Sequence, residues 1–228
     1  MDNILQLNKI NKIYGTTIQT QVLFDIDLAF ETGSFNSIIG QSGSGKSTLM
    51  NIMGTLDRPT KGTIKINNTD ISTLKSKELA LLRNQTIGFI FQFHYLLPEF
   101  TAIQNILMPA RIKNKQVSAE TLAWAQELIE ITGLTKVKNN PASKMSGGQQ
   151  QRTAIARALI NKPKIILADE PTGNLDSDTA EQIYALMREI NQKYGTTFIL
   201  ITHDQNIAQK TDRIVEIKDG KIQADLRR

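Results

Sequence analysis

Hydrophobic and polar positions alternate along residues 22–30 (VLFDIDLAF), and this alternation predicts a half-buried β-strand. Its apolar side is expected to consist of Val22, Phe24, Ile26, Leu28 and Phe30. Residues 63–67 (TIKIN) predict a second, shorter strand that ends at an Asn-Asn turn. Three further short runs are rich in apolar residues and bounded by turn signals: Phe35–Ile39, Ile165–Ala168 and Phe198–Ile201. Such runs are typical of central strands that a parallel sheet buries on both faces.

Two segments carry helical patterns with clear ends. Ser118–Thr132 begins at Ser118, a favourable N-cap, and Ser177–Tyr194 follows the same rules; each stops before a glycine. Because strands and helices alternate, the chain is expected to be α/β with a parallel core. From about His94 to Ile160 the pattern is helical without strands, and we interpret this stretch as an inserted helical subdomain.

The composition is ordinary for a globular protein, with 40% hydrophobic and 21% charged residues among 228. This length predicts one large domain, or one domain with a subdomain. The chain has no cysteine, which fits a reducing compartment. Its net charge of +5 is spread without a basic block, so no nucleic-acid partner is expected. The apolar runs fall short of the roughly 20 residues of a membrane helix, so the chain is not expected to cross a membrane.

Residues 40–47 (GQSGSGKS) fit the phosphate-loop motif G-x-x-x-x-G-K-[ST]. Glycines let backbone N–H groups wrap phosphates, the lysine amine neutralises the terminal phosphates, and the serine hydroxyl can ligate Mg²⁺. The alternative is a chance match or a turn with a surface lysine, but the strand before and the helical pattern after are the context that the motif requires. The candidate phosphate-binding residues are Gly40, Ser42, Gly43, Ser44, Gly45, Lys46, Ser47 and Thr48.

Asp169 and Glu170 end the apolar run IILADE. Adjacent residues of an extended chain point to opposite sides, so the two acids should have different functions. Asp169 fits a Mg²⁺-side partner of Ser47, and Glu170 fits a carboxylate that polarises water for attack on a γ-phosphate. An isolated Asp-Glu pair after a strand is more often a helix cap, but the phosphate loop makes the catalytic interpretation the stronger one.

Four other residues carry little information alone: Tyr14, Gln92, Asp176 and His203. Tyr14 suits stacking on a nucleotide base, with a turn aromatic as the alternative. Gln92 suits contact with Mg²⁺ or water, and His203 suits a bond to the γ-phosphate, although a lone histidine is usually structural. These residues gain weight because each ends or adjoins a predicted strand, and strand carboxyl ends face the ligand in open α/β sheets.

Ser146, Gly147 and Gly148 precede an amphipathic helical run, QQQRTAIARALI. The start of a helix has unpaired N–H groups and the positive end of the dipole, so it suits an anion. No lysine follows the glycines and no strand precedes them, so this is not a complete phosphate loop. A serine-capped helix explains the serine but not two consecutive glycines. The segment itself does not indicate which phosphate it meets.

Over nearly its whole length the sequence resembles the ATPase subunits of ABC transporters, whose motifs occur here in the family's order. The matching residues are the nucleotide-stacking Tyr14, the Walker A loop, the Q-loop Gln92, the signature Ser146-Gly147-Gly148-Gln149, the Walker B Asp169 and Glu170, the D-loop Asn174-Leu175-Asp176 and the switch His203. Met145 and Gln41 depart mildly from the usual motif residues. Neither departure removes a phosphate-contacting group.

The resemblance implies an α/β P-loop NTPase core with a mostly parallel sheet, an antiparallel β part near the N-terminus and an inserted helical subdomain. Within one domain of residues 1–228, it implies a nucleotide-binding core of residues 1–92 and 161–228 and a subdomain of about 93–160. The implied cofactors are ATP and Mg²⁺. The implied metal ligands are Ser47, Gln92 and Asp169.

The resemblance also implies roles for the remaining motif residues. The implied catalytic residues are Glu170, His203 and Gln92. Two copies of the chain would pack head to tail, with each signature helix facing the nucleotide held by the other copy. In such a pair the phosphate loop of the other copy supplies Lys46, which would explain why the signature segment has no lysine of its own. The nucleotide-contacting residues outside the phosphate loop would then be Tyr14, Ser146, Gly147, Gly148, Gln149 and Asp176.

Two stretches resemble a narrower group, the ATPases that serve lipoprotein-releasing and macrolide-exporting permeases. They are QFHYLLPEFT at Gln92–Thr101, which is nearest to the lipoprotein-releasing ATPases, and PTGNLD at Pro171–Asp176. This resemblance implies an integral membrane permease as partner, docking near Phe93–Phe100, unless those residues are subdomain core. It also implies a cytoplasmic location on the inner face of the cytoplasmic membrane, and export or extraction as the direction of transport.

Three other classes share part of this pattern. Chromosome-maintenance and DNA-repair ATPases carry these motifs, but a long coiled coil normally separates them, and no heptad run fills residues 41–145. Translation-associated ABC proteins carry two ATPase units in one chain, whereas this chain has one set of motifs. A small-molecule phosphotransferase leaves the signature and His203 unexplained. The sequence therefore favours an ATPase that powers a membrane complex, and it does not identify the transported substrate.

Overall fold

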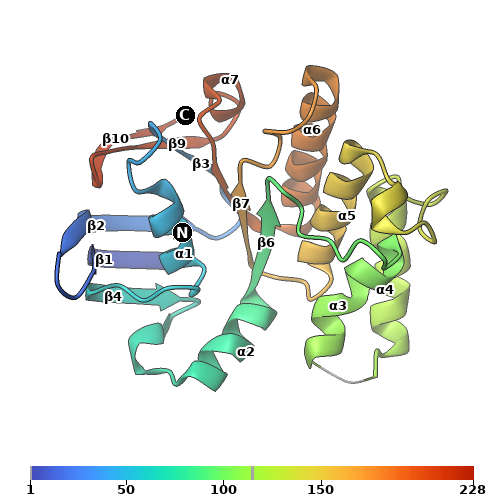
Figure 1. Ribbon diagram of the computed structural model, residues 1–228, viewed down its shortest axis with the longest axis horizontal. Coiled ribbons are helices and arrows are strands. Elements are labelled where there is room, and N and C mark those ends of the chain that lie inside the picture. Colours follow the sequence, from blue (N-terminus) through green and yellow to red (C-terminus); the bar gives the residue numbers. More distant parts are fainter. Residues whose placement is uncertain (1, 114–115) are drawn as a thin grey trace.

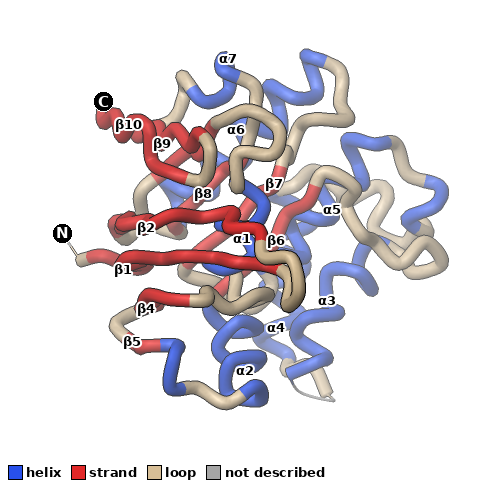
Figure 2. Tube along the Cα trace, turned by 60° about the vertical axis from the view of Figure 1, so that its left-hand side comes forward, coloured by secondary structure: helices blue, strands red, loops and turns tan. Residues whose placement is uncertain are grey.

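The computed structural model describes residues 2–113 and 116–228 and contains two β-sheets with helices around them (Figure 1). The smaller sheet is antiparallel and has the strand order β2-β1-β4-β5. Its strands are β1 (Asn3–Tyr14), β2 (Thr20–Glu31), β4 (Lys61–Ile66) and β5 (Thr69–Asp70). Figure 2 shows these strands side by side as one layer. The antiparallel part expected near the N-terminus is confirmed.

The larger sheet has the order β10-β9-β3-β8-β7-β6 and is parallel except where β10 pairs with β9. Its strands are β3 (Phe35–Ile39), β6 (Ile87–Phe91), β7 (Ile165–Asp169), β8 (Thr197–Ile201), β9 (Arg213–Lys218) and β10 (Lys221–Arg227). The three short runs predicted as central strands are β3, β7 and β8. They lie next to one another and are buried along almost their whole length.

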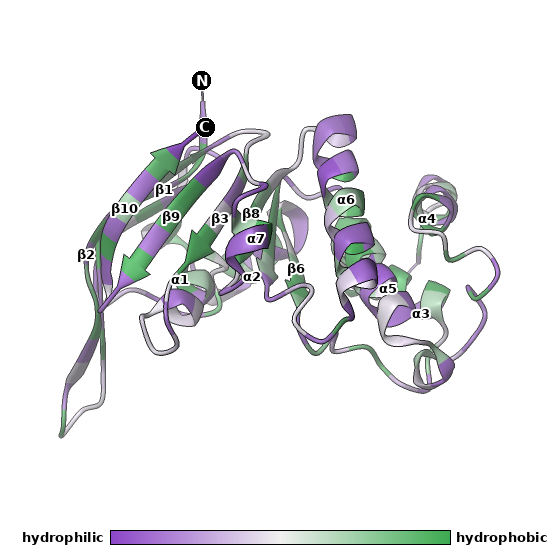
Figure 3. Ribbon diagram, turned by 90° about the horizontal axis from the view of Figure 1, so that it is seen from above, coloured by the Kyte–Doolittle hydropathy of each residue, from purple (hydrophilic) through white to green (hydrophobic). Residues whose placement is uncertain are grey.

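Helices flank the larger sheet on both faces. The helices are α1 (Lys46–Met53), α2 (Ser76–Thr86), α3 (Ala102–Lys113), α4 (Ala119–Ile131), α5 (Gly147–Leu159), α6 (Ser177–Tyr194) and α7 (Gln205–Ala208). Two short 3-10 turns occupy Ile71–Thr73 and Ala142–Lys144. Seen from above, the strands lie to one side and α3 to α6 to the other (Figure 3).

Two apolar cores hold these layers together. The first lies between the antiparallel sheet, α1 and one face of the larger sheet, and includes Leu5, Ile26, Leu49 and Ile199. The second lies between the other face and α3 to α6, and includes Phe35, Ile106, Leu128, Ile155 and Met187. Full burial of such a side chain stabilises a fold by about 1.5–3 kcal/mol. The larger sheet, packed on both faces, is therefore a firm support for residues at its strand ends.

The predicted phase of residues 22–30 is wrong in its first half. Leu23 is buried there, whereas Val22 and Phe24 are only half-buried. The cause is a β-bulge, because Ile10 faces Ile26 while Lys12 faces Leu23, so β2 has one extra residue between these pairs. Asp25 lies at the bulge with a left-handed backbone (φ 45°). The alternation is reversed before the bulge, which turns Val22 towards the site described below.

The two predicted helices are confirmed. Ser118 caps α4 by accepting a hydrogen bond from the backbone N of Thr121 at 3.2 Å. Helix α6 spans the predicted residues and ends at Gly195, which is left-handed (φ 64°). The described residues between 94 and 160 contain α3, α4 and α5, and an isolated bridge joins Thr101 to Pro141.

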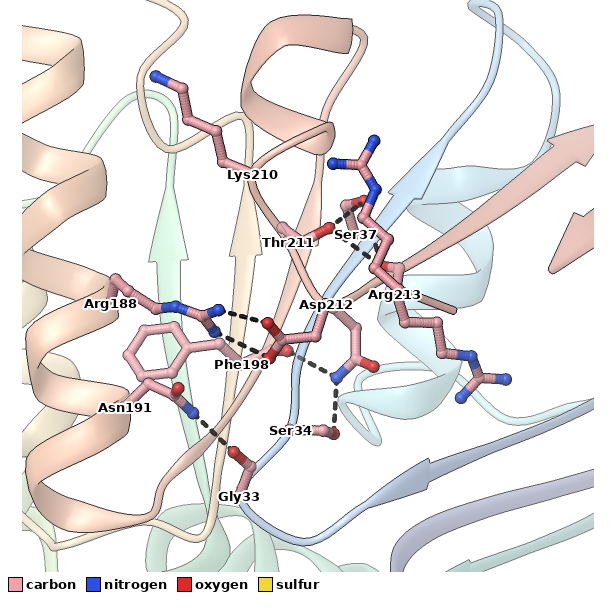
Figure 4. Close-up of polar contacts among 12 residues, drawn as sticks. Gly33, Ser34, Ser37, Arg188, Asn191, Phe198, Lys210, Thr211, Asp212 and Arg213 are labelled. Carbon is pink, nitrogen blue, oxygen red and sulfur yellow. Dashed lines mark hydrogen bonds and ion pairs between the residues drawn. The ribbon is translucent and has the colours of Figure 1, made fainter. Parts of the chain in front are cut away.

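A polar network ties α6 to the larger sheet (Figure 4). Arg188 of α6 forms a two-bonded ion pair with Asp212, which precedes β9. Asn191 donates its side-chain amide to the carbonyl of Gly33 at 2.9 Å, and the buried Asn36 of β3 donates to a carbonyl of β8 at 3.1 Å. An unpaired buried polar group costs about 1–3 kcal/mol, so these bonds hold α6 firmly against the sheet.

Candidate nucleotide-binding site

The carboxyl ends of β3, β6, β7 and β8 lie along one edge of the larger sheet, where a cavity of about 740 Å³ opens. Parallel strands bring the residues that follow them together at this edge, even from distant parts of the chain. The lining residues are Val22, Ser42, Gly43, Gly45, Lys46, Ser47, Thr48, Gln92, Asp169, Glu170, Ile201 and His203. All except Val22 and Ile201 were singled out from the sequence.

The phosphate loop connects β3 to α1. Gly43 and Gly45 have φ angles of 80° and 104°, a left-handed backbone that favours glycine. Gly40 has no room for a side chain, because a Cβ there would lie 2.2 Å from the carbonyl oxygen of Ile217. Gly40 and the buried Ser44 shape the loop without lining the cavity. The loop leads into the N-terminus of α1, where N–H groups and the helix dipole favour a phosphate.

Lys46 is held inside its own loop. Its Nζ donates to the carbonyl oxygens of Gly40 and Gln41, each at 2.8 Å. An ammonium group has three donors, so one remains for a ligand. An incoming phosphate oxygen carries a full charge and forms a stronger bond than a neutral carbonyl does. The loop therefore positions its lysine before a phosphate arrives.

Asp169 ends β7 and lines the cavity together with Ser47 and Gln92. Burial raises the pKa of the Asp169 carboxyl, the charge of Glu170 raises it further, and Lys46 lowers it. Hydroxyl, carboxylate and amide oxygens are the ligands that Mg²⁺ prefers, usually together with phosphates and water. Within residues 2–113 and 116–228, no three His, Cys, Asp or Glu side chains form a dedicated metal cage. This donor set fits a Mg²⁺ ion that is shared with a nucleotide.

Glu170 follows β7 and is bound to the residues that follow β8. Its Oε1 accepts hydrogen bonds from the backbone N of His203 at 3.0 Å and from the ring Nδ1 at 2.6 Å. Its Oε2 accepts one from Thr202 Oγ1 at 3.1 Å. A carboxylate has about four lone-pair positions, so one remains free on Oε2. Since Nδ1 of His203 is engaged, Nε2 is the ring nitrogen left for a ligand.

Thr202 is a site residue that the sequence did not reveal. It is almost fully buried, and its hydroxyl fixes the oxygen of Glu170 that retains a free lone pair. A threonine after an apolar strand is common, so nothing in the local sequence distinguishes it. Only the neighbouring position of β7 and β8 brings Thr202 and Glu170 together.

Gln92 follows β6 and is paired with Asn174. Its Nε2 donates to Asn174 Oδ1, and Asn174 Nδ2 donates to the backbone carbonyl of Gln92, both at 3.1 Å. Gly173 makes room for this contact, because a Cβ there would lie 2.9 Å from Gln92 Nε2. With Nε2 held by Asn174, the amide oxygen of Gln92 is left for a cation or a water.

Tyr14 and Asp176 also lie outside the cavity lining. Tyr14 ends β1 with a partly exposed ring, and its hydroxyl donates to Asp57 Oδ2 at 2.7 Å. Asp176 caps α6 by accepting hydrogen bonds from the N and the Oγ1 of Thr179, at 2.9 and 2.8 Å. These bonds lower the pKa of the Asp176 carboxyl. Within its own chain Asp176 is thus a helix cap.

The signature segment also lies outside its own chain's cavity. Ser146 caps α5, since its Oγ accepts from the backbone N of Gln149 at 3.3 Å. In return, Gln149 Oε1 accepts from the backbone N of Ser146 at 3.0 Å, which completes a capping box. The Ser146 hydroxyl accepts in this arrangement, so its own proton is available for donation to a ligand.

The two glycines of the signature differ in their surroundings. A Cβ at Gly148 would lie 2.8 Å from Cγ2 of Thr179, so packing against α6 excludes a larger residue there. A Cβ at Gly147 would meet Leu175 at 3.5 Å, which is an ordinary contact. Packing against α6 therefore gives Gly148 a structural reason that helix capping alone did not supply. The surroundings of Gly147 supply no such reason.

A second cavity, of about 670 Å³, lies at the amino ends of β7 and β8. Its lining includes Trp124, Lys164 and Tyr194. It contains neither the phosphate loop nor the adjacent carboxylates. The phosphate chemistry therefore belongs to the first cavity.

Comparison with known proteins agrees with this geometry. A family model described as "ABC transporter" matches residues 23–173. The lipoprotein-releasing system ATP-binding protein LolD 1 of Rhodopseudomonas palustris is 49% identical over 224 residues, which is 97% of this chain and 99% of that protein. LolD of Bacteroides thetaiotaomicron is 46% identical over 222 residues, 97% of this chain and 100% of that protein.

Two solved structures share the fold. The ATP-binding cassette MJ0796, described in a dimeric post-hydrolysis state bound to ADP and Pi, has a TM-score of 0.88, 40% identity and coverage of 98% of both chains. The protein cbiO1 of Clostridium perfringens, part of the ABC transporter complex cbiONQ, has a TM-score of 0.88, 29% identity and coverage of 99% of this chain and 88% of that one. The chain therefore belongs to the ABC transporter family, as an ATP-binding subunit that hydrolyses ATP.

Proposed function

We propose that this ATPase drives the release of lipoproteins from the cytoplasmic membrane, as a subunit of a complex with an integral membrane permease. The observation that carries the ATPase mechanism is the shared cavity, which is lined by the phosphate loop, Gln92, Asp169, Glu170 and His203. The lipoprotein substrate is supported by relatives of nearly equal length whose names contain it. Lipoprotein release is preferred to macrolide export because the relatives compared above are named as lipoprotein-releasing proteins.

ATP is the substrate that the cavity binds. The N–H groups of the phosphate loop and of the start of α1 surround its phosphates, and Lys46 neutralises the terminal ones. Tyr14 stacks on the base. Ser47, Asp169 and Gln92 would hold Mg²⁺, which neutralises phosphate charge when it is bound. Gln92 suits this role because Asn174 already occupies its amide nitrogen.

Glu170 is the general base in this mechanism. The free lone pair on Oε2 accepts a proton from the attacking water, while Thr202 and His203 fix the carboxylate. General-base assistance accelerates a reaction by about 10²–10⁴-fold. His203 contacts the γ-phosphate through Nε2, because Nδ1 is bound to Glu170. The same histidine thus links the state of the phosphate to the orientation of the base.

Two copies of the chain act as a head-to-tail pair. The start of α5 does not line its own chain's cavity, although the Ser146 proton is available and packing does not require a glycine at 147. In the pair this helix start meets the terminal phosphates held by the partner copy's loop, and Lys46 of that copy supplies the cation. The dimeric structures of the cassette MJ0796 support the pairing of two copies.

The permease docks on residues 93–100. Four large side chains are exposed within these eight residues, which argues against a core role: Phe93 at 67%, Tyr95 at 65%, Leu97 at 43% and Phe100 at 36%. His94 and Tyr95 are left-handed, and Arg157 of α5 donates to both of their carbonyl oxygens at 2.6 Å. These two bonds fix the backbone that carries the aromatic side chains, which would contact the apolar face of a permease helix.

The protein is placed on the inner face of the cytoplasmic membrane by its permease. Among the described residues, no helix combines the length and the hydropathy that crossing a bilayer requires. Attachment through residues 93–100 explains how such a chain works at a membrane. The energy of ATP-driven pairing is then delivered to the permease through the docking segment.

The proposal is tested by isolating the complex and by depletion. A tagged Glu170→Gln chain, extracted with detergent and Mg-ATP from the membranes of its own cells, should retain a permease with several membrane spans. The Phe93→Ser/Tyr95→Ser variant on the same background should lose this permease and keep ATP binding. Depletion of the chain should leave lipoproteins in the cytoplasmic-membrane fraction. Unchanged lipoprotein sorting, or retention of nucleic acid in place of a permease, would contradict the proposal.

A further inference from the structure

A lysine is buried on β1 close to the candidate nucleotide site. Lys12 is 8% exposed, and its Nζ donates to Asp57 Oδ1 at 2.7 Å and to the carbonyl oxygen of Arg58 at 2.8 Å. A buried ammonium group is unfavourable unless it is paired, and an apolar residue would fill the same space without this requirement. The fold alone does not explain why a charge occupies this position.

Asp57 joins this lysine to Tyr14. Its Oδ1 accepts from Lys12 and from the backbone N of Arg58 at 2.7 Å, and its Oδ2 accepts from the Tyr14 hydroxyl at 2.7 Å. Burial alone would raise the pKa of the Asp57 carboxyl, but hydrogen bonds from Lys12, Tyr14 and Arg58 lower it overall. The Asp57 carboxylate is therefore charged, and hydrogen bonds hold both of its oxygens. Its Oδ2 is thus an acceptor at a fixed position for the Tyr14 hydroxyl.

The ring of Tyr14 contacts Lys12 and is partly exposed. Lys12 Nζ lies over the ring at 4.6 Å from its centre, in a cation–π contact. The residue is nevertheless 41% exposed. Burial and the bond to Asp57 raise the pKa of the Tyr14 phenol, and the nearby Thr48 side chain lowers it. Thr48 belongs to α1 and lines the nucleotide cavity, so the phenol lies beside the phosphate-binding helix.

We propose that Lys12 and Asp57 are positioning residues that hold Tyr14 in the orientation in which its exposed ring stacks on the nucleotide base. This inference rests on the stacking role proposed for Tyr14. An exposed aromatic side chain that is ordered only on binding weakens affinity, and the pair orders Tyr14 beforehand. Loss of this restraint should weaken ATP binding by about two- to tenfold, whereas loss of the stack itself should weaken it by roughly fivefold or more.

Two variants separate positioning from stacking. Tyr14→Phe keeps the ring and removes the bond to Asp57. Lys12→Met/Asp57→Leu replaces the ion pair by apolar residues of similar size, a change that a fold often tolerates. The affinity of each variant is measured by calorimetry with ATP and with inorganic tripolyphosphate, both without Mg²⁺, so that neither hydrolysis nor metal binding contributes. Thermal unfolding shows that each variant is folded.

Both variants should lose affinity for ATP and keep wild-type affinity for tripolyphosphate, which has no base. Wild-type ATP affinity in either variant, or an equal loss for both ligands, would overturn the positioning role. Tyr14→Ala tests the underlying assumption separately. If Tyr14→Ala binds ATP as the wild type does, the stacking role of Tyr14 fails. If Tyr14→Ala binds ATP weakly while the other two variants bind it normally, only the inference about Lys12 and Asp57 fails.

Discussion

Replacing Glu170 by glutamine removes one negative charge and keeps the size of the side chain. The glutamine carbonyl can still accept both hydrogen bonds from His203, and its amide can donate to Thr202 Oγ1. Bonds to a charged acceptor stabilise a fold by about 1.5–3 kcal/mol and neutral ones by about 0.5–1.5, so the two His203 bonds lose roughly 2–3 kcal/mol together. The loss of repulsion on Asp169, whose pKa Glu170 raises, acts in the opposite direction.

The sign of this second effect follows from linkage. An acid whose pKa is raised in the folded state stabilises the fold below its unfolded pKa and loses that contribution as pH rises through the folded pKa. Asp169 is such an acid, with burial as the first cause and Glu170 as the second. Glu170→Gln should lower the pKa of Asp169 in the folded state. The fold should therefore be less destabilised by the charged Asp169 at neutral pH, whereas near pH 3 Asp169 is protonated and the substitution brings no such gain. We therefore expect Glu170→Gln to remain folded and to bind ATP.

Turnover should respond very differently. Without a carboxylate to accept the proton, the rate should fall by about 10²–10⁴-fold, or roughly 2.7–5.5 kcal/mol in the barrier. Head-to-tail pairs should then accumulate with Mg-ATP, because hydrolysis no longer separates them. The assays are the initial ATPase rate at saturating Mg-ATP and gel filtration of the same sample.

Thr202→Val is the matched control for Glu170→Gln. It removes the hydroxyl bound to Oε2 and keeps the carboxylate, so its rate should stay within about tenfold of the wild type, the effect of one hydrogen bond. Three results would refute the reasoning. They are a wild-type rate in Glu170→Gln, a Glu170→Gln protein that stays monomeric with Mg-ATP, and a Thr202→Val rate as low as that of Glu170→Gln.

Four further predictions concern other parts of the chain. Lys46→Ala should abolish ATP binding in calorimetry, because the cavity lining loses its lysine; near-normal affinity would contradict the phosphate-loop assignment. Gly147→Ala should keep folding stability within about 0.5 kcal/mol and weaken ATP-driven pairing. Gly148→Ala should lower the Tm, and adding Thr179→Ser to it should restore the Tm, because the contacting methyl group is removed; equal Tm values for Gly148→Ala and the wild type would contradict the packing contact. Tyr95→Ser should weaken permease docking without lowering the Tm, and a fall of many degrees would mean that this residue belongs to the core. Burial raises the pKa of Tyr184 to about 12, so stability should fall as pH rises from 10 to 12, and Tyr184→Phe should fall less over that range in chemical denaturation.

The sequence by itself determined the elements whose signals are local. The phosphate loop, the strand before it and the helix after it are contiguous, and the same residues carry the pattern and the function. Helix α6 has the predicted ends because its cap and its terminal glycine lie next to its apolar stripe. Most of the cavity lining was therefore found before the fold was known, since these residues belong to the phosphate loop and its helix, or lie at or just after the end of a strand.

The sequence did not reveal β1, β9, β10 or α2. In β1 the buried side includes a lysine, and β10 is an edge strand that is exposed or half-buried along its length. Neither strand shows the regular alternation of apolar and polar residues by which a strand is recognised in a sequence. Both form because they pair with neighbouring strands, which the local sequence does not show. The reversed phase of β2 has the same origin, since the bulge at Asp25 is defined only against β1.

Only the tertiary structure decided which side chains meet. Glu170 lies 33 positions from His203, Gln92 lies 82 from Asn174 and Lys12 lies 45 from Asp57, yet each pair shares a hydrogen bond. Such a bond requires two atoms within about 3 Å of each other, and only the packed order of the strands brings them that close. The sequence could propose the type of each group, because chemistry belongs to the side chain. The proton acceptor left free on Glu170, and the partner that orients Tyr14, depend on neighbours that folding alone supplies.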